Sequence, residues 1–200
     1  MNKWDKFYKE DPNAFDQVSS TIKEILKYKK QGSVLDLGCG KGKNAIFLAE
    51  NGFKVEGIDI SKLAIKEAKE RVKEKNLKIS FKALDMGRLK YNKKYDIIIN
   101  NRILHYFKKE KGLEIIKNMQ KNTDRGGINL ISAFIAELPF FYNGNKDMCY
   151  FKKKQLKEIY KEWEILSYKE KIGKVLQKDK NGNNLKQKKA IILTQKIKYN

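Results

Sequence analysis

The chain has 200 residues, and 45 lysine and arginine residues against 24 aspartate and glutamate residues give it a formal net charge of +21. This length suits one domain with its own core, and no apolar run approaches the roughly 18 residues that span a membrane. The N-terminus shows no apolar leader, and Cys39 and Cys149 do not suggest a disulfide framework, so we expect a cytoplasmic protein with no membrane partner.

The positive charge raises the question of a nucleic-acid partner, because basic side chains that neutralise phosphates drive such binding. Arginine, whose planar fork suits phosphate and base contacts, is rare here, and the lysines are dispersed along the chain rather than gathered in one stripe. A compositional bias toward lysine explains this pattern as well. A nucleic-acid partner is therefore possible but disfavoured, and the sequence does not indicate the oligomeric state.

Apolar periodicity alternates between helical and strand patterns along the chain. Helices are predicted over 13–30, 43–50, from the capping Ser61 onward, over 113–119 and over 155–160. Strands are predicted over 33–37, 53–58, 78–84, 95–99, 128–134, 164–175 and 190–195, with an irregular segment over 136–150. Asn181-Gly182 is typical of a tight hairpin turn between the last two strands. The pattern predicts an α/β, doubly wound, mostly parallel sheet that ends in an antiparallel hairpin.

A glycine loop follows the first predicted strand, and a carboxylate stands at its entrance. The run Asp36-Leu37-Gly38-Cys39-Gly40 leads into the helix over 43–50. The carboxylate would repel the pyrophosphate of a dinucleotide but attract a cationic sulfonium that bears an α-amino group. The third glycine of the dinucleotide fingerprint is also missing, because position 43 is lysine. S-adenosylmethionine is a ligand with the required charge.

Acids also end the next two predicted strands. Asp59 follows Gly40 by 19 residues, the interval at which an acid accepts hydrogen bonds from the hydroxyls of a ribose. Asp85 can accept the exocyclic amine of adenine while Met86 covers the ring edge, although Asp85 is also a typical loop acid before a glycine. Ligands bind beyond the carboxyl ends of parallel strands, so these acids predict one cofactor site.

The chain resembles the class I S-adenosylmethionine-dependent methyltransferases and, within them, the tellurite-resistance methyltransferase group. The class-level resemblance covers 33–134. The narrower one rests on Leu35-Asp36-Leu37-Gly38-Cys39-Gly40-Lys41-Gly42-Lys43-Asn44 and on the segments 118–120, 126–131, 150–152, 163–166 and 181–183. The resemblance implies a seven-stranded Rossmann-like sheet whose last strand is inserted antiparallel, and a methyltransferase that acts on a small-molecule acceptor.

The expected organisation is a single methyltransferase domain over 1–200. It comprises a helical cap over 1–31, a cofactor-binding core over 33–135, and an acceptor loop and hairpin over 136–200. No metal site is expected. The residues expected to bind the cofactor are Asp36, Gly38, Cys39, Gly40, Asn44, Asp59, Ile60, Asp85, Met86 and Asn101.

His105, the single histidine of the chain, is the candidate catalytic residue, because it follows the fourth predicted strand in Leu104-His105-Tyr106. It would deprotonate or orient the acceptor, although a packed, hydrogen-bonded histidine in the pocket wall is the simpler interpretation. Aromatic residues near the N-terminus, Tyr8 among them, and the segment 138–142 are candidates to cover an acceptor, or else pack as ordinary core.

The acceptor itself stays open. Relatives that methylate tellurium or selenium oxyanions resemble this chain but have a His-Arg pair before the terminal hairpin and an arginine after it. This chain has Leu176-Gln177 and Lys188 there, and lysine lacks the fork that holds an oxyanion at two points. Another anionic compound or a thiol is also possible. Two alternatives differ in class: an RNA-directed methyltransferase, and a module that binds S-adenosylmethionine without catalysis.

Overall fold

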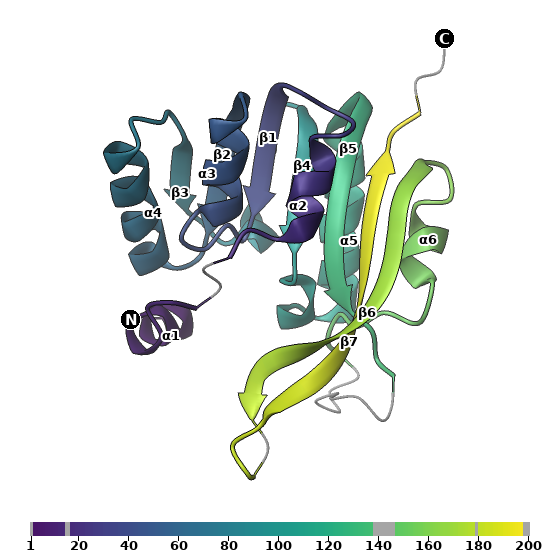
Figure 1. The fold of residues 1–200 in the computed structure, drawn as a ribbon. Coiled ribbons are helices and arrows are strands. Elements are labelled where there is room, and N and C mark those ends of the chain that lie inside the picture. Colours follow the sequence, from purple (N-terminus) through teal and green to yellow (C-terminus); the bar gives the residue numbers. More distant parts are fainter. Residues whose placement is uncertain (1, 15–16, 138–146, 179, 198–200) are drawn as a thin grey trace. The chain divides into compact units, whose positions relative to one another are not determined.

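A computed structural model of the chain describes residues 2–14, 17–137, 147–178 and 180–197 (Figure 1). Within β6 the side chains of residues 174 and 176–178 also lie outside this description. The chain divides into two compact units, Met1–Ile99 and Asn100–Asn200. None of the helices in the described ranges has the length and apolar character needed to cross a membrane.

The first unit alternates helices with parallel strands. Its elements are α1 (Lys3–Glu10), α2 (Ser20–Ile25), β1 (Gly32–Leu37), α3 (Lys43–Glu50), β2 (Phe53–Asp59), α4 (Lys62–Glu74), β3 (Ser80–Ala83), the 3-10 helix η1 (Met86–Arg88) and most of β4 (Tyr95–Asn101). β2 pairs in parallel with β1, where Asp36 lies opposite Gly57, and with β3, where Asp59 lies opposite Ala83. These registers bring the carboxyl ends of the three strands together.

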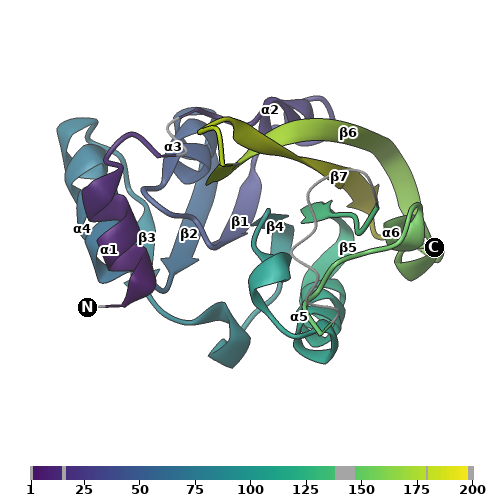
Figure 2. The ribbon, with the colours of Figure 1, turned by 90° about the horizontal axis from the view of Figure 1, so that it is seen from below.

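The second unit contains a long antiparallel arrangement (Figure 2). Its elements are the 3-10 helix η2 (Leu104–Tyr106), α5 (Lys109–Lys121), β5 (Thr123–Phe134), α6 (Gln155–Ile159), β6 (Glu164–Lys178) and β7 (Asn184–Gln195). β7 is antiparallel to both β5 and β6, and the β6–β7 hairpin is bulged between Ile165 and Ser167. The predicted Asn-Gly turn joins these two strands, and Gly182 has the left-handed φ of 80° that it requires.

The strand order is β3-β2-β1-β4-β5-β7-β6 in a seven-stranded mixed sheet. This order confirms the predicted doubly wound α/β fold with its antiparallel C-terminal pair. The three consecutive isoleucines of β4, Ile97 to Ile99, are fully buried, as expected for a strand covered on both faces. The apolar face of α4 is also buried, with Ile65, Ala68 and Val72 at helical spacing.

The prediction of one helix over 13–30 was wrong. Among the described residues of that range the structure has one helix, α2, which is six residues long. The lysine-rich stretch 27–30, which has no apolar face to bury, follows it without helical structure. The unpredicted helix α1 lies further upstream. It begins because the Asn2 side chain accepts hydrogen bonds from the backbone N–H groups of Trp4 and Asp5.

Several strand boundaries also differ. β3 is shorter than predicted, whereas β5 begins at Thr123 and β7 at Asn184 rather than at 128 and 190. The added part of β7 is polar, so no apolar alternation marks it. It is a strand because it pairs with β6, as in the opposition of Lys188 and Ile172.

Candidate functional site

The predicted cofactor site lies where β1, β2 and β3 end in the first unit. Backbone hydrogen bonds join these ends: the N–H groups of Gly38 and Cys39 donate to the Ile58 carbonyl at 2.8 and 2.9 Å, and Leu84 N–H donates to the Asp59 carbonyl at 2.8 Å. Three neighbouring chain segments are therefore fixed to one another. Asp36 lies within β1, Asp59 is the last residue of β2, and Asp85 comes two residues after β3.

The glycine loop has the backbone geometry that its sequence predicts. Gly40 has a φ of 54° and Gly42 a φ of 78°, in the left-handed region that favours glycine. Space is limited as well, since a Cβ atom at Gly40 would lie 2.6 Å from the Tyr8 hydroxyl oxygen and one at Gly42 2.7 Å from the Phe81 ring. Gly42 is also the N-cap of α3. The loop therefore requires glycine for both conformation and packing.

Asp59 connects this loop to β2. Its Oδ2 accepts a hydrogen bond from Gly40 N–H and its Oδ1 accepts one from Ser61 N–H, each at 2.9 Å. Ser61 in turn caps α4, because its hydroxyl accepts from Ala64 N–H. Burial raises the pKa of the Asp59 carboxyl, while the two backbone hydrogen bonds oppose that shift. Each oxygen keeps a further lone pair with which to accept a ligand hydroxyl.

Asp36 is the most unusual group at the site. It is 1% exposed, and its Oδ2 has no hydrogen-bond partner among the described residues. Burial, and then the nearby charge of Asp59, raise the pKa of Asp36 from its ordinary value of 3.8 to about 7. A cation that reached these two carboxylates would lower the free energy of both ionised groups.

Cys39 is a buried structural thiol. Its Sγ lies 2.9 Å from the position of a Cβ atom at Gly57, so the sulfur packs against the backbone of β2. Burial, followed by the charges of Asp36 and Asp59, raises the pKa of the Cys39 thiol well above its ordinary value. A thiolate nucleophile is therefore not available at this position.

The other predicted cofactor residues of this unit surround the strand ends. Asn44 accepts a hydrogen bond from Ser19 N–H at 3.3 Å, so its side-chain oxygen contacts the segment before α2. Ile60 is exposed at 45%, directly after Asp59. Asp85 caps η1, because its Oδ1 accepts from Gly87 N–H at 2.8 Å, and Met86 beside it is buried. Asp85 is thus a typical loop acid before a glycine. Its Oδ2 does not take part in the hydrogen bond to Gly87.

Helix α1 is attached to the same strand ends, which sequence reasoning did not find. Asn2 donates from Nδ2 to the Ile60 carbonyl at 2.9 Å. Asp5 accepts from the Ser61 hydroxyl at 2.7 Å and from Leu63 N–H at 3.1 Å. The signal for the helix was present, because Asn2 is a typical N-cap residue, but its contacts span more than fifty residues of sequence.

Lys41 connects the glycine loop to α4 and to the segment after α1. This buried lysine lies 2.5 Å from Glu67 of α4 and donates to the Pro12 carbonyl at 2.7 Å. Its ammonium also lies 5.5 Å from the centre of the Tyr8 ring. Tyr8 thus packs beside the glycine loop. Phe15, another aromatic residue near the N-terminus, and the segment 138–142, which was expected to help cover an acceptor, lie outside the described residues.

The remaining two predicted site residues belong to the second unit. Asn101 ends β4 and is half-buried. His105 is 8% exposed in η2, where its ring centre lies 3.9 Å from that of Tyr106 and 4.2 Å from that of Phe134. The histidine is therefore packed among aromatic rings.

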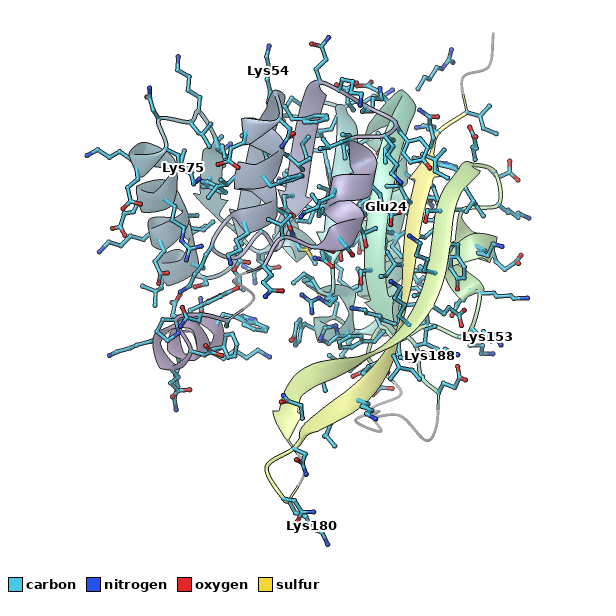
Figure 3. All side chains as sticks on the ribbon, viewed as in Figure 1. Glu24, Lys54, Lys75, Lys153, Lys180 and Lys188 are labelled. Atoms are coloured by element: carbon cyan, nitrogen blue, oxygen red, sulfur yellow. The ribbon has the colours of Figure 1, made fainter. Side chains whose placement is uncertain are left out.

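Lys188 is held by acids in the same unit. Its ammonium lies 2.7 Å from Glu137 and 3.3 Å from Glu170, and these carboxylates raise the pKa of the lysine. Figure 3 shows it where β6 and β7 cross, far along the hairpin from Lys180 at the tip. Leu176 and Gln177, named with it at the sequence level, belong to β6, but their side chains lie outside the described part.

A doubly wound sheet with a glycine loop and acids at its strand ends is the arrangement of Rossmann-like folds, the methyltransferases among them. Magnesium protoporphyrin IX methyltransferase (ChlM) from Synechocystis PCC 6803, solved with bound SAH, superposes with a TM-score of 0.69 over 98% of this chain and 95% of that chain. At 18% identity this likeness shows the fold.

The chain belongs to the family described as tellurite resistance protein TehB, whose model matches residues 1–193. It is 36% identical over 185 residues to the "Probable S-adenosyl-L-methionine-dependent methyltransferase TehB" of Haemophilus influenzae, covering 90% of this chain and 62% of that protein. The crystal structure of TehB from Haemophilus influenzae matches with a TM-score of 0.83 and 32% identity, over 96% of this chain and 66% of that one. The chain thus spans slightly less than two thirds of the length of these relatives.

More distant similarity extends to enzymes with other names. A "Ribosomal protein L11 methyltransferase" from Thermosipho africanus is 31% identical over 133 residues, which are 65% of this chain and 49% of that protein. The match to the TehB family confirms the resemblance drawn from the sequence.

Proposed function

We propose that this chain is an S-adenosylmethionine-dependent methyltransferase that acts on a small-molecule acceptor. The observation that carries the proposal is the buried pair Asp36 and Asp59 beside the glycine loop, with the Asp36 Oδ2 unpartnered within the described residues. This arrangement suits a ligand that brings positive charge and hydrogen-bond donors. The names of the TehB relatives support the same cofactor.

Each acid has a distinct role in this proposal. Asp36 attracts the positively charged amino acid end of the cofactor, and Asp59 accepts hydrogen bonds from the ribose hydroxyls. Asp85 accepts from the adenine amine, with Ile60 and Met86 covering the apolar faces of the ring. Gly38 and Gly40 let the ligand approach the backbone closely.

The bound cofactor supplies a methyl carbon that its positive sulfur already activates toward a nucleophile. The protein therefore has to hold and orient the reactants. Such positioning lowers the activation barrier by about 7 to 11 kcal/mol in favourable systems. A general base typically raises the rate by roughly 10²- to 10⁴-fold, which is a smaller effect. In this scheme His105 orients the acceptor or removes its proton, and it is the catalytic residue that we propose.

Transfer of a labelled methyl group tests this function. The protein is incubated with methyl-labelled S-adenosylmethionine and, separately, with tellurite, selenite, a panel of carboxylic acids and thiols, and bulk RNA. Label in a small molecule supports the proposal. Label only in RNA, with a steep salt dependence, would replace it by the RNA-directed alternative. Tight cofactor binding without transfer to any acceptor would favour a binding module.

A further inference from the structure

Arg102 has a backbone conformation that invites an explanation. It follows β4 with a φ of 61°, and its N–H donates to the Ser132 carbonyl at 2.7 Å. A left-handed conformation costs free energy for a long side chain, and such strain concentrates at functional sites. Of the two other non-glycine residues described with positive φ, Asn76 is a type that tolerates it, and Lys154 donates its N–H to Glu170 as the N-cap of α6.

A second cation lies in the sheet of the same unit. Lys189 of β7 is opposite Phe134 of β5 on one side and opposite Lys171 of β6 on the other. Residues directly opposite in antiparallel strands present their side chains on the same face. These three side chains therefore form a row, and the His105 ring lies 4.2 Å from Phe134, between centres.

Lys189 lacks the acidic partners that Lys188 has within the described part of the chain. Lys189 is half-buried and forms no ion pair within the described part of the chain, and burial, then Arg102 and Lys171, lower the pKa of its ammonium. Burial also lowers the pKa of the Arg102 guanidinium. Two half-buried cations that repel each other are stabilised when an anion binds between them.

We propose that Arg102 and Lys189 bind the anionic group of the methyl acceptor, and that the acceptor carries this group on a planar, apolar body. This inference rests on the proposed function and adds the substrate class to it. The anionic group, a carboxylate in the simplest case, accepts hydrogen bonds from the Arg102 fork and from the Lys189 ammonium.

The aromatic side chains argue for the apolar body. Phe134 and Tyr106 are half-buried, both rings contact His105, and Phe134 lies opposite Lys189 in the sheet. A flat hydrocarbon ring gains from packing on such faces. A small inorganic oxyanion would leave these surfaces unused, so an aromatic carboxylate fits the cluster better than selenite does.

Benzoate is the probe for the test, with benzamide as its neutral analogue and selenite as an inorganic oxyanion. Binding of each is measured by calorimetry or by NMR titration, with and without S-adenosylhomocysteine. We expect benzoate to bind at least tenfold more tightly than benzamide or selenite. Equal affinity for benzamide, or no benzoate binding, would refute the proposal that Arg102 and Lys189 bind an anionic group. A preference for selenite would refute the proposal that the acceptor has a planar, apolar body.

Four variants locate the site. Arg102→Asn removes the charge with a residue that accepts the left-handed backbone, so the fold is retained, and Lys189→Gln removes the second charge. Each should weaken benzoate binding at least tenfold, and Lys189→Arg should restore it. Lys186→Gln, an exposed lysine of the same strand, removes an equal charge and should change the affinity less than threefold.

The outcome separates the two proposals. Wild-type affinity in Arg102→Asn and Lys189→Gln, or an equal loss in Lys186→Gln, would overturn the acceptor assignment. Cofactor affinity is measured on the same variants and should stay within threefold of wild type. If benzoate binds as expected but S-adenosylmethionine does not, the anion site stands and the proposed methyltransferase function fails.

Discussion

Replacement of Asp36 by asparagine should stabilise the protein without ligand while weakening its binding of the cofactor. The wild-type carboxylate is buried beside Asp59, and its Oδ2 has no partner within the described ranges. Asparagine keeps the shape and removes the charge. A residue that destabilises the ligand-free protein is typically kept for function rather than for stability.

The magnitude follows from the pKa of Asp36, which burial and Asp59 raise from 3.8 to about 7. At pH well above 7 the native carboxylate is ionised, and the shift corresponds to a cost of about 4 kcal/mol at 1.36 kcal/mol per pKa unit. The new amide brings donors that are not fully satisfied, a cost of about 1 to 3 kcal/mol. We therefore expect a net gain of about 1 to 3 kcal/mol in the free energy of unfolding at pH 8.

The sign of the pH dependence is fixed by the direction of the shift. Between pH 3.8 and 7 the native Asp36 binds more protons than the unfolded chain does, so this group makes the wild type less stable as pH rises through that range. The advantage of Asp36→Asn should accordingly grow from pH 4 to pH 7 and then level off. Urea unfolding of both proteins at several pH values measures it.

Cofactor binding is the second readout of the same variant. S-adenosylhomocysteine lacks the sulfonium charge but keeps the amino group, so its affinity should fall at least tenfold in Asp36→Asn. A difference in stability that does not vary between pH 4 and pH 8 would refute the argument from burial. Full cofactor affinity in the variant would refute the role assigned to Asp36.

Three further predictions concern the glycine loop, helix α1 and His105. Gly42→Ala should lower the free energy of unfolding in urea by about 2 to 4 kcal/mol, because the added Cβ meets the Phe81 ring. Gly182 has a similar φ but open space around it, so Gly182→Ala should lower the free energy of unfolding by only about 1 kcal/mol. Equal losses in the two variants would contradict the packing argument. Asp5→Ala should lower the unfolding free energy by about 1 to 2 kcal/mol, since two donors lose their acceptor, and an unchanged urea midpoint would show that α1 is not held by this residue. His105→Ala should reduce turnover at least tenfold while cofactor affinity in a titration stays intact, and unaltered turnover would remove the histidine from the mechanism.

The glycine loop could be located from the sequence because its signals are local. Asp36 lies near the end of an apolar strand pattern, Gly40 follows it within a few residues, and Asp59 lies at the end of the next strand. Parallel strands then bring these positions together without further information. The continuous isoleucines of β4 identified the buried part of the sheet in the same way.

Other features depend on contacts between distant segments. The attachment of α1 needs Asp5 to reach Ser61, and the buried Lys41 needs Glu67, and neither pairing has a sequence signature. Lys189 lies opposite Phe134 because of the register between β5 and β7. This register could not be predicted, because the first residues of β7 are mostly polar and show no apolar alternation. Sequence patterns therefore predicted most of the elements and the position of the acids at neighbouring strand ends, but not the distant segments that contact them.

Calorimetric titration of S-adenosylhomocysteine and of NAD into the wild type and into Asp59→Ala tests the central claim most directly. The account predicts that S-adenosylhomocysteine binds the wild type, that NAD does not bind, and that Asp59→Ala binds S-adenosylhomocysteine at least tenfold more weakly. Undiminished affinity in Asp59→Ala, or preferential binding of NAD, would contradict it.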